Sequence, residues 1–356
     1  MNHDKMSRRV FAKCMAAVPL IATMSCTTDV SQRRYRGLRS DHFDGERFFT
    51  PGAQPPRGWI DALRWSFAGG RVEWPDSCPS PFPPDHPPTR VKTGLRVVLV
   101  GHSSFLVQGA GLNILIDPIW SERASPVTFA GPRRKNPPGI AFDDLPPIDV
   151  VLVSHNHYDH MDRRTLYRLW ARHNPRFVAP LGNEEGLCGG ERRMQVETAD
   201  WGDTVTLGPQ VSVRLEPARH WSTRGLGDRN RALWSAFTIR LGDRVVYFAG
   251  DTGFGDGRTF EQAASTAGRI DVALLPIGAY APRWFMEDQH MNPQEAVRAF
   301  ELLGARTALG CHWGTFQLTD EGFEQPMLDL ASALAAKGIP AERFLAMRPG
   351  QVWSTT

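Results

Sequence analysis

Four side chains that can bind a metal ion lie within one short segment of this sequence. His155, His157, Asp159 and His160 follow one another over six residues. In an extended segment alternate residues point the same way, so His155 and His157 share a direction, and a turn can bring Asp159 and His160 beside them. Neutral imidazoles accompanied by a carboxylate are typical ligands of Zn²⁺. The spacing therefore predicts two adjacent metals, each bound by part of the segment.

Three further ligand-type residues each follow a predicted strand. His220 comes after residues 211–215, Asp251 after residues 244–248 and His312 after residues 307–309. Loops at the carboxyl ends of strands are where functional sites collect in layered folds. Asp251 has two carboxylate oxygens and could bridge two metals, and the glycines near it would let the backbone come close. We therefore expect these residues to complete the same site.

A lone histidine is more often a core or surface residue than a ligand. His42, His86 and His173 are interpreted in that way, whereas His102 lies at the end of a predicted strand and is left undecided. The cluster that begins at His155 differs, because its polar groups are packed behind an apolar strand. Burying them unpaired would cost a few kcal/mol each, on the order of 2–7. Metal coordination removes that cost.

Strands and helices must position these residues. Apolar runs predict strands at residues 95–100, 105–107, 112–116, 148–153, 211–215, 237–240, 244–248, 272–276 and 307–309. Helices are predicted at residues 163–172, 293–303 and 328–337, and Asn292 and Pro293 suit the start of the second one. Many short strands with helices between them predict two sheets with the helices outside.

The beginning of the chain is predicted to be a targeting signal. Residues 7–13 resemble the twin-arginine export motif, and the apolar stretch that follows is shorter than the ~20 residues needed to span a bilayer. Cys26 is a candidate lipoprotein cysteine, although Thr23 stands where such a signal usually has Leu. An uncleaved N-terminal anchor is the alternative. We expect residues 1–26 to direct export to the periplasm, with lipid anchoring to a membrane left open.

Composition restricts the remaining possibilities. The chain of 356 residues has 41 basic and 38 acidic side chains, and this small excess gives no support for nucleic-acid binding. Prolines concentrate between Pro75 and Pro88, so residues 27–90 are predicted to form an extended arm around a domain at residues 91–356. No disulfide or cysteine-based metal site is predicted, because the cysteines outside the signal have no close spacing; they are Cys78, Cys188 and Cys311.

The ligand pattern resembles the full ligand set of the metallo-β-lactamase superfamily. Its His-x-His-x-Asp-His motif begins at His155, and His220, Asp251 and His312 complete it. Other segments resemble the branch of the N-acyl-phosphatidylethanolamine-hydrolysing phospholipases D. These segments are residues 117–119, 123–126, 131–134, 220–222, 230–234, 277–286, 289–290 and 312–316. The resemblance spans roughly residues 90–320 and implies a four-layer αββα sandwich.

The resemblance also implies roles for individual residues. One Zn²⁺ would be held by His155, His157, His220 and Asp251, and a second by Asp159, His160, Asp251 and His312. Tyr158 and His290 would contact the substrate headgroup, with Asp159 and His290 as the catalytic side chains. Zinc lowers the pKa of bound water to about 7, so a nucleophile would exist at neutral pH. The expected reaction is hydrolysis of N-acyl-phosphatidylethanolamine to N-acylethanolamine and phosphatidic acid at a membrane surface.

Other functions stay open at this point. The same ligands could serve a lactonase, a phosphodiesterase with soluble substrates or a nuclease, although the near-neutral charge disfavours the nuclease. A non-enzymatic exported metal-binding protein has no need of a two-metal cluster, and a homodimer is left open. Aromatic residues in the motif segments could line a groove for acyl chains or pack in the core; they are Trp221, Trp234, Tyr280, Trp284, Phe285 and Trp313.

Overall fold

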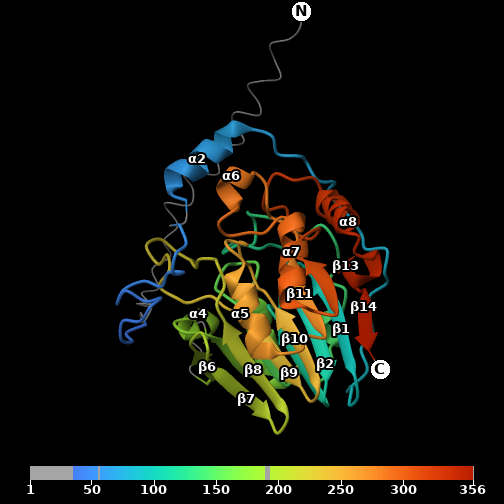
Figure 1. The fold of residues 1–356 in the computed structure, drawn as a ribbon. Coiled ribbons are helices and arrows are strands. Elements are labelled where there is room, and N and C mark those ends of the chain that lie inside the picture. The colour runs from blue at the N-terminus through green and yellow to red at the C-terminus, as the bar shows by residue number, and fades with distance from the viewer. Residues whose placement is uncertain (1–34, 55–56, 189–192, 356) are drawn as a thin grey trace, which may run out of the picture. The chain divides into compact units, whose positions relative to one another are not determined.

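Two mixed sheets of seven strands each form the centre of the protein (Figure 1). The computed structural model describes residues 35–54, 57–188 and 193–355, so the predicted export signal and Cys26 lie outside the described residues. The first sheet has the order β14 (Val352–Thr355), β1 (Leu95–Gly101), β2 (Ser104–Gly109), β3 (Leu112–Ile116), β4 (Val150–Leu152), β5 (Arg176–Pro180) and β6 (Val196–Ala199). The second has the order β13 (Phe344–Ala346), β12 (Thr307–Cys311), β11 (Val272–Pro276), β10 (Arg244–Phe248), β9 (Ala236–Leu241), β8 (Val211–Glu216) and β7 (Thr204–Gly208).

Each sheet has an antiparallel part and a parallel part. Strands β3 to β6 are parallel to one another, and so are β10 to β13. Apolar runs without alternation form the central parallel strands, because both of their faces are covered. Parallel strands end at the same edge of a sheet, so the loops that follow β4, β10, β11 and β12 collect there. These loops carry most of the predicted ligands.

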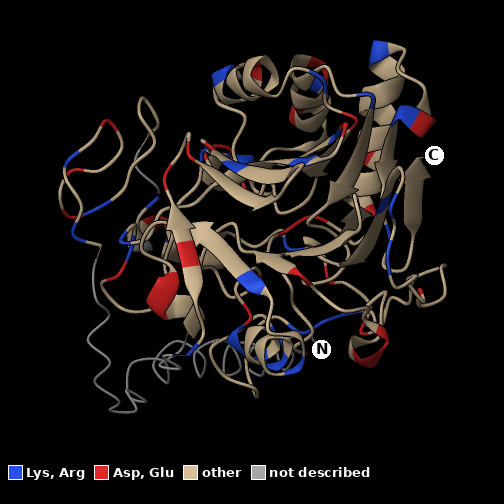
Figure 2. Cartoon of the chain, turned by 90° about the horizontal axis from the view of Figure 1, so that it is seen from below, with Lys and Arg blue, Asp and Glu red and all other residues tan. Residues whose placement is uncertain are grey.

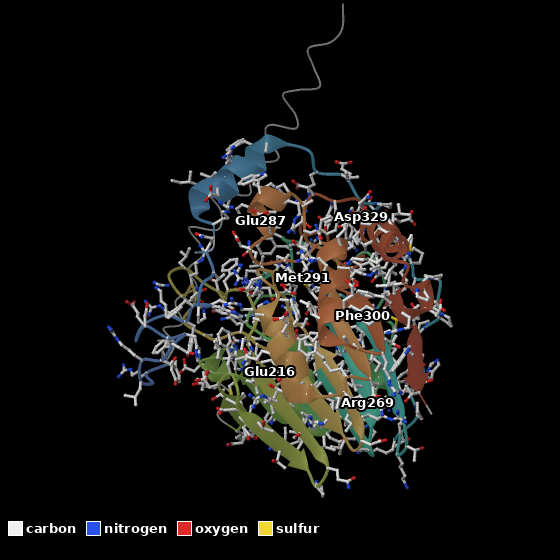
Figure 3. All side chains as sticks on the ribbon, viewed as in Figure 1. Glu216, Arg269, Glu287, Met291, Phe300 and Asp329 are labelled. Atoms are coloured by element: carbon white, nitrogen blue, oxygen red, sulfur yellow. The ribbon has the colours of Figure 1, made fainter. Side chains whose placement is uncertain are left out.

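The two sheets pack face to face, and helices cover their outer faces. The layer between the sheets contains buried side chains from both, including Phe105 on β2 and Phe248 on β10, whose ring centroids lie 6.4 Å apart. Helices α3 (Arg163–His173) and α4 (Glu184–Cys188) cover the first sheet. Helices α5 (Arg258–Ala267), α7 (Pro293–Leu303) and α8 (Gln325–Lys337) cover the second, where Phe300 of α7, labelled in Figure 3, packs on Phe344. The predicted αββα sandwich is confirmed.

Charged side chains lie mainly on the helices and loops, while the strands carry few (Figure 2). Helices α3 and α7 form within one residue of their predicted bounds, because their caps are encoded locally. Helix α8 has no side-chain cap and begins at Gln325, before its predicted start at residue 328. At α7, Asn292 accepts a hydrogen bond from the Glu295 amide at 2.8 Å, and the Glu295 carboxylate accepts one from the Asn292 amide at 3.0 Å. Two short 3-10 helices, at Phe142–Asp144 and Ala341–Arg343, complete the connections. In the described part of the chain, no helix is long and apolar enough to cross a membrane.

Residues 35–54 and 57–90 run along the surface of the sandwich and hydrogen-bond to it at several points. The amide of Phe48 donates to the carbonyl of Asn230, and that of Cys78 donates to the carbonyl of Lys135. Much of this arm is irregular, as its prolines predict, but it also contains α2 (Trp59–Ala68), which was not predicted. The proposed domain boundary at residue 91 stays a prediction.

Candidate metal centre

All seven predicted ligands converge in the loops that follow the strands, in two adjacent groups. The first group is His155, His157, His220 and Asp251; the second contains Asp159, His160 and His312. Within each group the candidate ligand atoms lie within 4.8 Å of one another. The arrangement is a binuclear His/Asp metal site.

Asp251 joins the two groups. Its Oδ2 lies 3.7 Å from His155 Nε2 and 3.8 Å from His220 Nε2, and it also lies 3.0 Å from His160 Nε2 and 3.1 Å from His312 Nε2. One carboxylate oxygen is therefore surrounded by imidazole nitrogens from both groups. A bridging ligand requires this position, and the loop after β10 provides it.

The spacing of the ligand atoms fits tetrahedral coordination. A metal with bonds of about 2.0–2.1 Å to its ligands would have neighbouring ligand atoms about 3.3 Å apart. In the first group, His157 Nδ1 lies 3.0 Å from His155 Nε2 and 3.2 Å from His220 Nε2. In the second, Asp159 Oδ2 lies 3.3 Å from His160 Nε2 and 3.4 Å from His312 Nε2. These atoms therefore have the separation that one shared cation would impose.

Unpartnered buried atoms point to the same conclusion. Among the described residues, Nε2 of His160, Nε2 of His312 and Oδ1 of Asp251 are buried without a hydrogen-bond partner. Buried polar atoms of this kind cost free energy unless something else satisfies them. Coordination of a metal would do so.

The electrostatics of the site favour positive charge. Burial lowers the pKa of His155 well below its usual value, and neighbouring imidazoles lower it further, so its nitrogens are free of a second proton. Burial alone would lower the pKa of His312 as well, but Asp251 and Asp159 outweigh it and raise that pKa to about 9. Burial raises the pKa of Asp251, yet His160 and His312 hold it well below its usual value. The carboxylates thus stabilise cations at the position that the ligand atoms enclose.

Outer hydrogen bonds orient the ligands. Asp117, at the end of β3, accepts from His160 Nδ1 at 2.7 Å, from the Ser154 hydroxyl at 2.6 Å and from the Ser154 amide at 2.7 Å. His220 Nδ1 lies 3.1 Å from the Gln289 carbonyl. Such partners fix the ring orientation and the tautomer of a metal-binding histidine. Asp117 was singled out in the sequence only as part of a branch motif, and its role comes from the structure.

His102 is a site residue that the sequence left undecided. Its ring is fully buried, and its Nε2 lies 2.8 Å from Asp159 Oδ2. Its carbonyl accepts a hydrogen bond from the His312 amide at 3.0 Å, and the two rings are 4.0 Å apart. Burial lowers the pKa of His102 to about 3, so the neutral ring can donate from Nε2 to the carboxylate. The only sequence signal for this role is its place in the turn between β1 and β2.

A cavity of about 190 Å³ opens onto the ligands, including His157, Asp159 and Asp251. His290 lines it, and its ring lies 5.1 Å from that of His220 and 5.3 Å from that of His312. Burial lowers the pKa of His290 to about 4, so the ring is neutral near pH 7. The structure therefore places His290 beside the metal site, where the resemblance implied a substrate contact.

Tyr158 occupies a different position. Its hydroxyl donates to the Arg224 carbonyl at 2.5 Å, and the Arg224 guanidinium lies over its ring at 4.2 Å. Arg224 in turn donates to the carbonyls of Asn156 and Met161, on either side of the ligand segment. In this arrangement Tyr158 supports the ligand loop and is not among the residues that line the cavity.

The aromatic residues of the motif segments divide into two sets. Trp234, Tyr280 and Trp313 are buried in the core. Trp221, Trp284 and Phe285 are only partly buried, and Trp221 and Phe285 line the cavity. Core packing thus applies to Trp234, Tyr280 and Trp313, the groove applies to Trp221 and Phe285, and Trp284 is partly buried without lining this cavity.

Comparisons with known proteins agree with this site. A family model described as a β-lactamase superfamily domain matches residues 112–313. The chain is 36% identical over 276 residues to an N-acyl-phosphatidylethanolamine-hydrolyzing phospholipase D of Caenorhabditis elegans, covering 74% of this chain and 77% of that protein. A mitochondrial N-acyl-phosphatidylethanolamine-hydrolyzing phospholipase D of Saccharomyces cerevisiae is 34% identical over 61% of this chain, and the match spans 47% of that relative.

A solved structure supports the fold. A metallo-β-lactamase fold protein from Bacillus subtilis aligns with a TM-score of 0.53 at 17% identity, covering 74% of this chain and 100% of that one. At this identity the likeness concerns the fold alone. The chain therefore belongs to the metallo-β-lactamase superfamily and is a metal-dependent hydrolase, similar to the N-acyl-phosphatidylethanolamine-hydrolysing phospholipases D.

Proposed function

We propose that this protein is a zinc-dependent phosphodiesterase of the phospholipase D type, which hydrolyses N-acyl-phosphatidylethanolamine to N-acylethanolamine and phosphatidic acid. The observation that carries the proposal is the pair of ligand groups joined through Asp251 beneath a cavity with aromatic walls. The relatives that are named for this activity are 36% and 34% identical to the chain. Zinc is proposed because four imidazole and carboxylate ligands at tetrahedral spacing suit it.

The chain's own residues would place the phosphodiester. Two zinc ions, when bound, would offset the charge of the phosphate and supply a nucleophile from water. His290 lies beside His220 and His312, which would hold these ions, and its carbonyl accepts a hydrogen bond from Arg283 at 2.9 Å. Arg283 is itself held by the Glu295 carboxylate at 2.9 and 3.0 Å, so the loop that carries His290 is anchored to α7. A ring N–H of His290 could then donate to a phosphate oxygen or to the leaving oxygen.

A membrane surface is the proposed partner, and α2 supports it. Ile60, Leu63 and Phe67 are 65%, 37% and 80% exposed, at a spacing that places them on one face of the helix. Trp65 of the same helix lines the cavity, and its ring lies 5.0 Å from that of Phe285. An exposed apolar face beside the cavity suits a helix at a lipid interface. We also propose export to the periplasm, on the basis of the twin-arginine-like residues 7–13.

The test is turnover by the full-length protein loaded with zinc. N-acyl-phosphatidylethanolamine would be supplied in detergent micelles, and the products would be identified by mass spectrometry. We expect phosphatidic acid and N-acylethanolamine, with loss of both in the His155→Ala variant. The matched control is His86→Ala, because His86 is an exposed histidine away from the ligand groups.

A lactone and a soluble phosphodiester serve as competing substrates. Turnover of either one by the zinc-loaded protein, without turnover of the phospholipid, would contradict the proposed substrate and leave the hydrolase assignment intact. Equal activity of the His155→Ala variant would contradict the proposed metal-dependent reaction.

A further inference from the structure

We propose that a second cavity, beside the loop that carries His220, binds a phosphate-like oxyanion through Arg219. The cavity has a volume of about 380 Å³ and lies between residues 41–52, the turn at Trp201 and Gly202, and the first turn of α5. It contains none of the metal ligands. The site is therefore separate from the cavity that opens onto the metal centre.

The side chain of Arg219 has no partner among the described residues. In the part of the chain that the structure describes, its guanidinium makes no hydrogen bond or ion pair, and its Nε is buried and unsatisfied. A guanidinium has five N–H donors in a planar fork that matches the oxygens of phosphate, sulfate or carboxylate. The partly buried guanidinium of Arg219 on the wall of this cavity is therefore suited to bind an oxyanion.

The carboxylates on the same wall are already engaged elsewhere. Asp41 lies 2.6 Å from His42 Nδ1, and Asp256 forms an ion pair with Arg258 at 3.4 Å. Neither forms an ion pair with Arg219 within the described residues. Arg219 therefore contributes positive charge to the cavity that no described side chain neutralises.

The first turn of α5 adds a hydroxyl donor to the same cavity. Thr259 lines the cavity, and its hydroxyl is buried without a hydrogen-bond partner in the described chain. Two amides of this turn are already used, because that of Arg258 donates to Asp256 Oδ1 at 3.2 Å and that of Phe260 donates to the Gly257 carbonyl at 3.0 Å. The donors that the cavity offers to an anion are therefore the Thr259 hydroxyl and the Arg219 guanidinium. A hydroxyl and a guanidinium fork can both donate to the oxygens of one tetrahedral oxyanion.

Hydrogen bonds hold the backbone of Arg219 on both sides of the residue. Its amide donates to the Thr252 hydroxyl at 2.9 Å, and its carbonyl accepts from the Gly253 amide at 2.9 Å. Gly255, with a φ of +58°, leaves room for the guanidinium, because a Cβ at that position would overlap it. Arg219 is thus fixed between His220, which follows it in sequence, and the segment that follows Asp251. An anion held by Arg219 would be coupled mechanically to both ligands.

The ligand is identified by its chemistry as a phosphate-class oxyanion. It could be a free inorganic anion or the phosphate of a lipid headgroup, since both present the same oxygens to the guanidinium. Sulfate is a suitable first probe because it has the same tetrahedral shape and is a weak ligand for zinc. This inference does not depend on the proposed phospholipase activity.

The test is calorimetric titration of the zinc-loaded full-length protein with sodium sulfate at constant ionic strength. We expect saturable binding of one anion per chain, weakened about tenfold or more in Arg219→Gln. Thr259→Val should weaken it by a smaller factor, and Arg164→Gln, a substitution at an exposed arginine on α3, should leave it unchanged. Metal content and thermal unfolding are measured for each variant to show that it is folded.

Two results would overturn the proposal: the absence of saturable binding in the unsubstituted protein, or equal affinity in Arg219→Gln. Competition then identifies the source of the anion. Displacement of sulfate by short-chain phosphatidic acid at far lower concentration than by inorganic phosphate would assign the site to a lipid headgroup. Equal displacement would assign it to a free anion.

Discussion

The two sheets contribute to the metal centre in different ways. The first sheet provides its ligands from one continuous segment after β4, which runs from His155 to His160. The second provides single ligands from separate loops, with His220 after β8, Asp251 after β10 and His312 after β12. The two contributions meet at Asp251, whose Oδ2 lies within 4 Å of imidazoles from both sheets.

The supports of the ligands differ in the same way. On the first sheet, buried side chains orient the ligands, because Asp117 holds His160 and His102 contacts Asp159. On the second sheet, backbone groups orient the ligands. An example is the Gln289 carbonyl, which contacts His220 Nδ1. A supporting side chain can be removed by a single substitution. The position of a loop depends instead on hydrogen bonds from residues that are distant in sequence.

The largest effect is expected at the residue that both sheets share. Asp251→Asn removes the bridging charge, so the protein should no longer bind two metals, and turnover should fall on the order of 1000-fold. Metal content by plasma mass spectrometry and turnover would be measured together. Two bound metals with full activity would show that Asp251 does not bridge.

A smaller effect is expected from a support on the first sheet. His102→Ala removes the donor to Asp159, so the affinity of the second metal should fall by about 10–100-fold while the first stays bound. His102→Gln keeps an N–H donor and should retain more of the affinity. Competition with a chelator gives both affinities, and equal loss in the two variants would argue against hydrogen bonding as the cause.

On the second sheet, the residue to substitute is Glu321, which accepts hydrogen bonds from the loop after β11. Its carboxylate accepts from the amides of Ala279 and Ala281 at 2.6 and 3.1 Å and from the Thr319 hydroxyl at 2.8 Å. Glu321→Ala should lower the free energy of unfolding by about 2–3 kcal/mol, because buried donors lose their acceptor. Urea denaturation measures this loss. Metal content should not change, and a loss of metal would mean that the loop also positions a ligand.

The smallest effect is expected far from the site, at Asp271 before β11. Burial raises its pKa, but the Val245 amide and Arg269 outweigh burial and lower the pKa below its usual value. A carboxyl whose pKa is lower in the folded protein stabilises the fold at pH values above its unfolded pKa, which is about 3.9 for Asp. This contribution is lost as the pH falls through the lower pKa of the folded protein. Asp271→Asn should therefore cost up to about 1 kcal/mol at pH 7 and less near pH 3. Unfolding curves at both pH values test this, and a pH-independent difference would contradict it.

Much of the fold follows from local signals in the sequence. The strand at Leu112–Ile116 and the helix at Pro293–Leu303 form over the predicted residues, since one has an uninterrupted apolar run and the other a capping box. Helix α5 was missed because its N-cap is Gly257, which gives no capping signal. Strand β14 was missed because its partner, β1, lies at the other end of the sandwich domain in sequence.

The candidate site was predictable to the extent that it is contiguous. The spacing of the side chains from His155 to His160 is enough to predict a metal site. The single ligands were found because each follows a predicted strand. His102 has no such neighbours, and its contact with Asp159 depends on how β2 and β4 are placed by β3 between them. The unpaired state of Arg219 is likewise a property of the folded chain, since every arginine has the same chemistry in the sequence.

Metal ions held by Asp251 and its neighbours would form a reversible cross-link between the two sheets. A cation bound by His155 and His220 joins side chains that are far apart in sequence, and the unfolded chain has no such preformed site. Each tenfold rise in free metal above the dissociation constant would then add about 1.4 kcal/mol to the free energy of unfolding for each independent site. The melting temperature of this protein is therefore expected to rise with the concentration of the free metal that it binds, and a chelator is expected to lower it.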